Sequence, residues 1–289
     1  MKYGIYYSYW EKEWRADYIP YVKKVKDLGF DILEVGCHHF LDMDDDFLMK
    51  LKAEAEAQGI ILTGGYGPDA AHDIASADPA IQKAAFEKYE ATFKKMKTAG
   101  VKKLGGGLYS YWPVDYSKPI DKEGDRERSI RNMRELADMA AEYDITLGME
   151  VLNRFEGYIL NTCEEAVDFV DRIDRPNLKI MLDTFHMNIE EDSFGDAIRL
   201  AGDRLGHLHV GEANRRPPFA GGRIPWQEIG EALHDIHYTG DVVMEPFVRM
   251  GGTVGNDIRI WHDLSKGCPD EELDKDAATS VKFLRELWG

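Results

Sequence analysis

Short apolar runs alternate with longer amphipathic segments along the chain. A weak repeat joins them: an amphipathic segment ends in a glycine and a short apolar run follows, as around Gly29, Gly59, Gly100 and Gly240. Glycine is favoured directly after a helix because it adopts the left-handed backbone conformation at little cost. Each of these glycines therefore predicts a helix end followed by a strand, and their recurrence indicates repeated βα units.

The apolar runs predict eight strands. The first four lie near residues 3–7, 31–35, 60–64 and 103–107. The other four are the runs T-L-G-M-E, L-K-I-M-L-D, L-G-H-L-H and V-V-M-E, which end at Glu150, Asp183, His209 and Glu245. Short runs of this kind are typical of strands that are buried on both faces of a parallel sheet.

Helix signals fall between the predicted strands. Asp78 followed by Pro79 predicts a helix over about 81–96, and the capping box of Thr162 and Glu165 predicts one near Glu164. A last helix is expected over about 272–287. Parallel strands need crossover helices, so eight strands that are each followed by a helix predict an α/β fold, the (β/α)₈ TIM barrel. Because no linker of Pro, Gly or Ser divides the sequence, we expect a single domain over residues 1–289.

The strand register supports this interpretation. Side chains alternate along a strand, so turning the four polar strand-end residues inward turns their neighbours outward, toward the helices. Those neighbours are all apolar: Met149, Leu182, Leu208 and Met244. His207 then shares the inward face with His209, one layer deeper, where we expect a hydrogen-bonded core histidine rather than a ligand.

The four strand-end residues predict a metal site. They are 33, 26 and 36 positions apart, close to the roughly 31 residues per unit of an eight-unit barrel of about 250 residues, whose strand ends converge on one mouth. Three carboxylates and one imidazole suit Mn²⁺, Mg²⁺ or Co²⁺ better than a thiolate-preferring ion. The alternative is that these acids only cap helix N-termini, which is common for one of them and less so for four.

Composition narrows the partners. With 53 acidic and 36 basic residues, the net charge of −17 opposes binding to nucleic acid or to anionic membranes, and a small neutral or cationic ligand fits better. The three cysteines are widely spaced and include no C-x-x-C pair, which argues against a disulfide framework. The sequence shows no signal peptide and no run of about 18 apolar residues. We therefore expect a soluble, cytoplasmic protein.

Polar and aromatic residues follow the predicted strand ends. The polar ones are Glu156, His186, Glu212, Asn214 and Arg215, and the aromatic ones are Tyr6, Trp14, Tyr66, Trp112 and Phe247. Such a mixture suits a polyhydroxylated ligand, because aromatic faces pack on C–H surfaces while a few polar groups fix hydroxyls. His38 and His39 are ambiguous and receive no role. Motifs for serine hydrolases, zinc proteases, P-loops and dinucleotide binding are absent.

Long motifs resemble those of one family. The segments M-E-V-L-N-R-F-E, M-L-D-T-F-H-M-N-I-E-E, G-H-L-H-V-G-E-A-N-R, G-R-I-P-W and V-V-M-E-P-F-V-R-M-G-G, with G-I-Y-Y-S-Y-W-E-K-E-W and L-Y-S-Y-W-P, are similar to the ketose 3-epimerases that act on D-psicose (D-allulose) or D-tagatose, within the xylose isomerase-like TIM barrels. The resemblance covers nearly the whole chain. It implies a barrel, a ketose substrate, a Mn²⁺- or Co²⁺-assisted reaction and a homodimer or homotetramer.

The resemblance also implies roles for individual residues. Carried onto this sequence, the metal ligands are Glu150, Asp183, His209 and Glu245. The contacts to substrate hydroxyls are Glu156, His186 and Arg215, and the aromatic pocket comprises Tyr6, Trp14, Trp112 and Phe247. The chain departs from its relatives in the loop R-R-P-P-F-A-G-G-R, in C-H-H-F, and at Tyr66 and Gly107. These departures bear on which ketose is preferred rather than on the chemistry.

The expected reaction interconverts D-fructose and D-psicose, or related ketohexoses, by removing and returning the proton at C3 through an enediolate. Inversion needs two bases on opposite faces of C3, and Glu150 and Glu245 are the candidates. Two alternatives stay open: an aldose–ketose isomerase on the same barrel, and a sugar-binding barrel without catalysis. A barrel of the abasic-site endonuclease type is opposed by the charge.

Overall fold

Eight parallel strands close into one barrel. The computed structural model describes all residues 1–289, and the strand order is β1 to β8 with β8 pairing in parallel with β1. The strands are β1 (Lys2–Tyr6), β2 (Ile32–Gly36), β3 (Ile61–Gly65), β4 (Lys103–Gly106), β5 (Thr146–Glu150), β6 (Leu178–Asp183), β7 (Leu205–Val210) and β8 (Asp241–Met244). The predicted (β/α)₈ barrel is confirmed.

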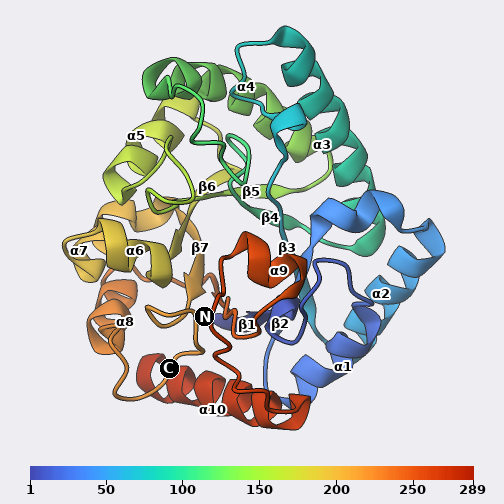
Figure 1. The fold of residues 1–289 in the computed structure, drawn as a ribbon, viewed down its shortest axis with the longest axis vertical. Coiled ribbons are helices and arrows are strands. Elements are labelled where there is room, and N and C mark those ends of the chain that lie inside the picture. Colours follow the sequence, from blue (N-terminus) through green and yellow to red (C-terminus); the bar gives the residue numbers. More distant parts are fainter.

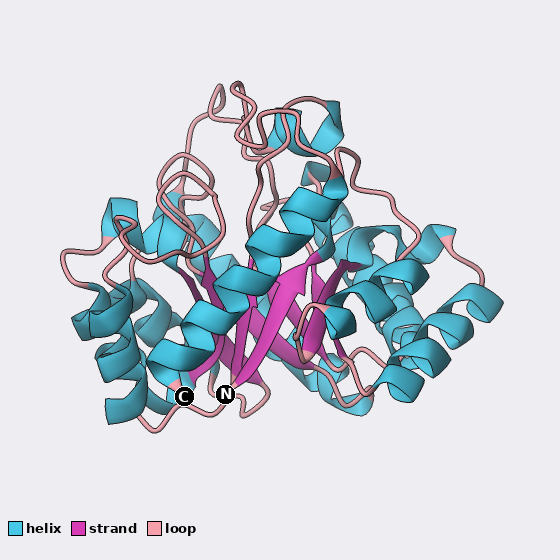
Figure 2. Cartoon of the chain, turned by 90° about the horizontal axis from the view of Figure 1, so that it is seen from below, coloured by secondary structure: helices cyan, strands magenta, loops and turns pink.

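Helices form a ring around the strands (Figure 1). They are α1 (Ile19–Asp27), α2 (Asp45–Gln58), α3 (Pro79–Ala99), α4 (Lys122–Glu142), α5 (Cys163–Ile173), α6 (Thr184–Glu190), α7 (Phe194–Ala201), α8 (Trp226–Asp235), α9 (Gly252–Asp257) and α10 (Asp270–Trp288). Short 3₁₀ turns follow β1 (η1, Tyr7–Tyr9), β2 (η2, Cys37–Asp42), β3 (η3, Ala70–His72) and α7 (η4, Gly202–Arg204). Figure 2 shows the long loops gathered at the end of the barrel opposite the two termini.

The predicted helix signals act as expected, with longer helices than the pattern indicated. The Asp78 side chain accepts a hydrogen bond from Ala80 N, so α3 begins at Pro79 and runs to Ala99. Thr162 caps α5 by accepting from Glu165 N. The Glu165 carboxylate accepts from Asn161 N, one residue before the capping residue. Two units carry two helices after one strand: α6 and α7 after β6, and α9 and α10 after β8.

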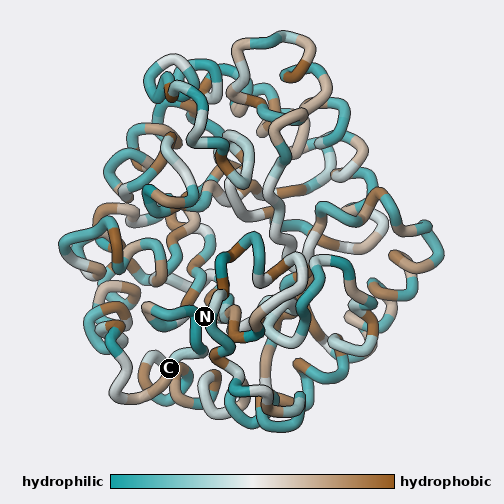
Figure 3. The backbone as a smooth tube through the Cα atoms, viewed as in Figure 1, coloured by the Kyte–Doolittle hydropathy of each residue, from teal (hydrophilic) through white to brown (hydrophobic).

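The predicted inward and outward faces are confirmed. The outward residues Met149, Leu182, Leu208 and Met244 are buried in one apolar core between strands and helices. Hydrophilic and hydrophobic stretches alternate along the surrounding helices (Figure 3), as expected when one face of each helix packs on the barrel. The barrel interior is more polar. His207 is a buried core residue there, 1% exposed, but neither of its ring nitrogens makes the expected hydrogen bond; its Nε2 lies 3.2 Å from Glu34 Oε2. At the amino end, Lys103 Nζ lies 2.5 Å from Asp241 Oδ2. None of the helices is both long and apolar enough to span a membrane.

Gly106 gives a test of how tightly the end of β4 is packed. Its φ of +126° lies in the region that favours glycine, and a Cβ there would collide with the backbone oxygen of Tyr66. We expect Gly106→Ala to lower the free energy of unfolding by about 2–3 kcal/mol in urea denaturation, because strained backbone and a backbone clash act together. Gly107→Ala is the control, since its Cβ would meet only Leu152 Cδ1, at 3.5 Å. Equal stability of the two variants would contradict this packing.

Candidate active site at the barrel mouth

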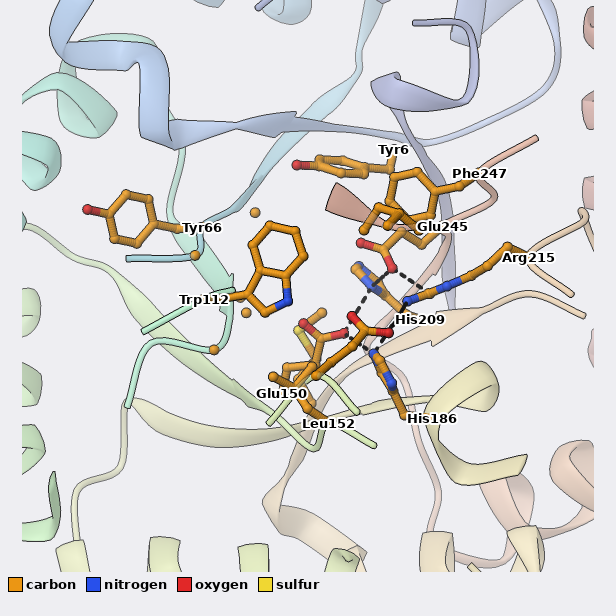
Figure 4. Close-up of a pocket in the computed structure, with 18 of the residues that line it drawn as sticks. Tyr6, Tyr66, Trp112, Glu150, Leu152, His186, His209, Arg215, Glu245 and Phe247 are labelled. Atoms are coloured by element: carbon orange, nitrogen blue, oxygen red, sulfur yellow. Dashed lines mark hydrogen bonds and ion pairs between the residues drawn. The ribbon is translucent and has the colours of Figure 1, made fainter. Parts of the chain in front are cut away.

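Four polar residues from adjacent strands meet at the carboxyl end of the barrel. Glu150 and Asp183 end β5 and β6, His209 lies in β7, and Glu245 directly follows β8 instead of ending it. One nitrogen or oxygen atom from each lies within 4.8 Å of the others. His209 Nδ1 is 3.5 Å from Glu245 Oε2 and 4.0 Å from Glu150 Oε1. The structure thus brings together the four residues that the strand ends predicted. Figure 4 shows Glu150, His209 and Glu245 of this group.

This donor set can hold a divalent cation. The three carboxylates offer hard oxygen atoms, which Mn²⁺, Co²⁺ and Mg²⁺ accept readily together with one imidazole. His209 Nδ1 is buried, faces the carboxylates and has no hydrogen-bond partner, although buried polar atoms are normally paired. An ion between the four residues would satisfy that nitrogen and offset the repulsion between the carboxylates. The arrangement therefore fits one metal ion.

The alternative that these acidic residues only cap helices is correct for one carboxylate oxygen, Oδ1 of Asp183. Asp183 Oδ1 accepts a hydrogen bond from Phe185 N at 2.7 Å and so caps α6. Its Oδ2 faces Arg215 at 2.7 Å, on the side of the other three residues. Glu150 and Glu245 cap no helix. Helix capping therefore explains how Asp183 is oriented but not why the four residues converge.

Arg215 is held rigidly among the carboxylates. It lies in the loop between β7 and α8, is 3% exposed and has a φ of +63°. Its Nη1 donates to Asp183 Oδ2 at 2.7 Å and to Glu245 Oε2 at 2.9 Å, and the guanidinium stacks over Phe185 at 3.8 Å. Its Nη2 lies 3.9 Å from Glu156 Oε1. The guanidinium thus balances buried negative charge while pointing into the cavity (Figure 4).

The surroundings give the carboxyl groups different proton affinities. Burial raises the pKa of Glu245, and the opposing effect of His209 and Arg215 offsets this rise only in part. Burial also acts to raise the pKa of Asp183, but Arg215, followed by His186 and His209, outweighs it and holds that pKa below its usual range. Asp183 is therefore the more firmly ionised of the two.

His186 presents one defined nitrogen to the site. It lies in α6, and its Nδ1 accepts from Asn153 N at 3.2 Å and lies 2.7 Å from Asn153 Nδ2. Because Nδ1 is an acceptor, these hydrogen bonds assign the proton to Nε2, which lies 3.5 Å from Glu150 Oε1. Asn153, which also donates to Glu156 Oε1 at 3.2 Å, was missed by the sequence analysis. Its position three residues after Glu150, in the same motif M-E-V-L-N-R-F-E, could have indicated that Asn153 belongs to the site.

One cavity joins these polar groups to the aromatic residues. It measures about 570 Å³, open solvent at its mouth included. The cavity is lined by every residue proposed to contact substrate: Tyr6, Trp14, Trp112, Glu156, His186, Arg215 and Phe247. Tyr66, Leu152, Met181 and Ile258 also line it, and three of these, all but Tyr66, carried no signal in the sequence. In Figure 4 the rings of Trp112 and Phe247 lie on the side of the carboxylates, whereas the Tyr66 ring points away from them.

Residues 12–14 and helix α9 are far apart in the sequence but are joined by hydrogen bonds at this cavity, a contact that we call the clasp. Trp14 Nε1 donates to Asp257 Oδ2 at 2.8 Å, and Thr253 Oγ1 donates to Glu13 Oε2 at 2.8 Å. Val254 N also donates to Lys12 O at 3.0 Å. Helix α9 accordingly lies inside the ring of helices (Figure 1). The clasp fixes Trp14 and Ile258 against the cavity.

The remaining polar residues singled out in the sequence do not line this cavity. Glu212 is buried and accepts from Trp226 Nε1 at 3.0 Å and from Arg223 N at 2.9 Å. Asn214 is exposed and does not line the cavity. His38 packs edge-on against Trp14 at 5.8 Å, and burial lowers the pKa of His38 to about 3, which keeps its imidazole neutral. His39 lies 3.3 Å from Asp42.

Comparison with known proteins places this geometry in a family. Residues 22–287 match the model of the xylose isomerase-like TIM barrel family. D-psicose 3-epimerase of Enterocloster bolteae is 53% identical over 100% of this chain and 96% of its own length. The Agrobacterium fabrum D-psicose 3-epimerase is 51% identical over the full length of both chains. A crystal structure of the Clostridium cellulolyticum H10 D-psicose 3-epimerase with D-tagatose superposes with a TM-score of 0.98 at 54% identity, covering 100% of this chain and 99% of that one. The chain therefore belongs to the ketose 3-epimerases within the xylose isomerase-like TIM barrel family.

Proposed function

We propose that this protein is a metal-dependent ketose 3-epimerase that interconverts D-fructose and D-psicose (D-allulose). The observation that carries the proposal is the convergence of Glu150 and Glu245 on one cavity, together with Asp183 and His209. The relatives of more than 50% identity are D-psicose 3-epimerases, and D-fructose is the C3 epimer of D-psicose. The proposed residues are the four metal ligands Glu150, Asp183, His209 and Glu245.

The bound ion would act as a Lewis acid, and the carboxylates of Glu150 and Glu245 would transfer the C3 proton. When bound, a divalent ion, Mn²⁺ or Co²⁺ in preference to Mg²⁺, would supply Lewis acidity that lowers the pKa of the C3 proton and stabilises negative charge on the sugar. Arg215 Nη1 and His209 Nδ1 both face Oε2 of Glu245, which leaves its Oε1 for proton transfer. His186 and His209 face Oε1 of Glu150, which leaves its Oε2. One carboxylate removes the proton from C3 and the other returns one to the opposite face.

The sugar is held by the remaining polar and aromatic residues. Glu156, His186 and Arg215 bind hydroxyl groups, and the rings of Tyr6, Trp14, Trp112 and Phe247 pack on C–H surfaces.

We also propose a homodimer or homotetramer. The support for this assembly is the resemblance of the sequence to the ketose 3-epimerases, which implies it.

Label incorporation tests the reaction directly. After a chelator removes bound metal, the protein should be inactive, and Mn²⁺ or Co²⁺ should restore conversion of D-fructose to D-psicose. In deuterated water the product should carry deuterium at C3. Formation of an aldose labelled at C2 would favour the isomerase, and ketose binding without turnover would favour a sugar-binding barrel.

The two-base scheme predicts a distinctive behaviour of single variants. Glu150→Gln and Glu245→Gln should each lose at least 100-fold in epimerisation, the usual scale for a general acid or base. Because one base remains, each variant should still exchange the C3 hydrogen of only one of the two epimers. Bound metal is measured in parallel, and Glu87→Gln on the exposed face of α3 is the control. A variant that exchanged both epimers, or still epimerised normally, would refute the scheme.

Arg215 tests the contribution of the guanidinium. Loss of charged hydrogen bonds to substrate costs about 1.5–3 kcal/mol each, so Arg215→Ala should raise KM at least tenfold. We expect kcat to fall as well, because Asp183 and Glu245 lose the group that holds them. Arg216→Ala is the matched control, since Arg216 faces a different surface hollow. Unchanged kinetics in Arg215→Ala would contradict the assignment.

A further inference from the structure

A buried carboxylate lies beneath the proposed metal site and has no part in the mechanism above. Glu34 sits in the middle of β2, pairs in register with Tyr6 of β1 and Thr63 of β3, and is 1% exposed. It points into the barrel interior, where a charged group without partners would cost several kcal/mol. Its position therefore calls for specific contacts that stabilise it.

Both oxygens of Glu34 are engaged. Oε1 lies 2.6 Å from His209 Nε2. Oε2 accepts from Thr63 Oγ1 at 2.7 Å and lies 3.2 Å from His207 Nε2. The carboxylate is thus anchored by Thr63 on the neighbouring strand and directs one oxygen at the far side of the His209 ring.

This contact determines which nitrogen His209 offers to the site. A carboxylate can only accept hydrogen bonds, so the proton of the neutral imidazole lies on Nε2 and the lone pair on Nδ1. Nδ1 is the nitrogen that faces Glu245 and Glu150 and has no hydrogen-bond partner. Carboxylates in this position orient metal-binding histidines and raise their basicity.

A second metal site is the rival interpretation of the same residues. Glu34, His207 and His209 each bring one atom within 4.8 Å of the others. Two ligands on one ion, each about 2.0–2.2 Å from it, stand about 3 Å or more apart. The 2.6 Å between Glu34 Oε1 and His209 Nε2 is instead the length of a direct hydrogen bond. The geometry favours hydrogen bonding over a second ion.

We propose that Glu34 is a positioning residue for the metal centre: through its hydrogen bond to Nε2, and with Thr63 as its own anchor, it holds His209 with Nδ1 aimed at the ion. This inference rests on the metal site of the proposed function but not on the identity of the sugar. Sequence analysis assigned no role to Glu34 or Thr63.

Metal affinity, measured by competition with a chelator, tests the proposal without reference to turnover. Glu34→Gln should bind Mn²⁺ about 10–100-fold more weakly than the wild type, the usual cost of losing such a partner, with one ion per chain in both proteins. Glu212→Gln is the matched control because Glu212 is also a buried, hydrogen-bonded carboxylate, and its Mn²⁺ affinity should be unchanged. Circular dichroism of the metal-free proteins checks that all are folded.

Thr63 provides a second variant in case Glu34→Gln does not fold. Thr63→Val should weaken Mn²⁺ binding several-fold, and Thr63→Ser, which keeps the hydroxyl, should restore it. Nitrogen-15 spectra of labelled histidine should place the His209 proton on Nε2 in the wild type.

Three results would overturn the proposal: wild-type affinity in both Glu34→Gln and Thr63→Val, a second ion in the wild type that Glu34→Gln loses, or no metal binding by the wild type. If the wild-type protein binds Mn²⁺ but has no epimerase activity, weaker Mn²⁺ binding in Glu34→Gln would support this proposal, while the missing activity would refute the proposed function.

Discussion

The main physical constraint on this structure is the negative charge gathered at the mouth of the barrel. Glu150, Asp183 and Glu245 come within reach of one another in a setting largely removed from water, where like charges repel strongly and desolvation adds to the cost. Arg215 offsets part of this through its contacts with Asp183 and Glu245. In the proposed function, a divalent ion held by the same carboxylates and by His209 would complete the balance. The need for a cation at this point links the fold to the proposed chemistry.

The barrel supplies what such a site requires. Adjacent parallel strands place the ends of β5, β6, β7 and β8 side by side, and the alternation of side chains turns one polar group from each toward the mouth while apolar neighbours pack against the helices. The layer below is polar as well: the Glu34 carboxylate is hydrogen-bonded to Thr63 and His209 and lies 3.2 Å from His207 Nε2. Rigidity at the mouth thus comes from both the strands and the layer beneath them.

The sequence predicted the strands and the four converging residues because both depend on local pattern: short apolar runs, each with a polar residue at its end. The predicted strand bounds differ from the observed ones by at most one residue, and Glu245 falls just beyond β8. The sequence did not predict Glu34, since one acid within I-L-E-V-G resembles a tolerated exception in an apolar strand. The clasp between Trp14 and Asp257 was also missed, because it joins residues 243 positions apart and no local signal connects them.

A crystal structure of the protein grown with Mn²⁺, with the ion located by its anomalous scattering, would test directly whether these four residues share one ion. We expect one anomalous peak, bound by oxygen atoms of Glu150, Asp183 and Glu245 and by Nδ1 of His209, with Glu34 still hydrogen-bonded to Nε2. A peak bound through Nε2, a peak between Glu34 and His207, or no peak at the barrel mouth would contradict it.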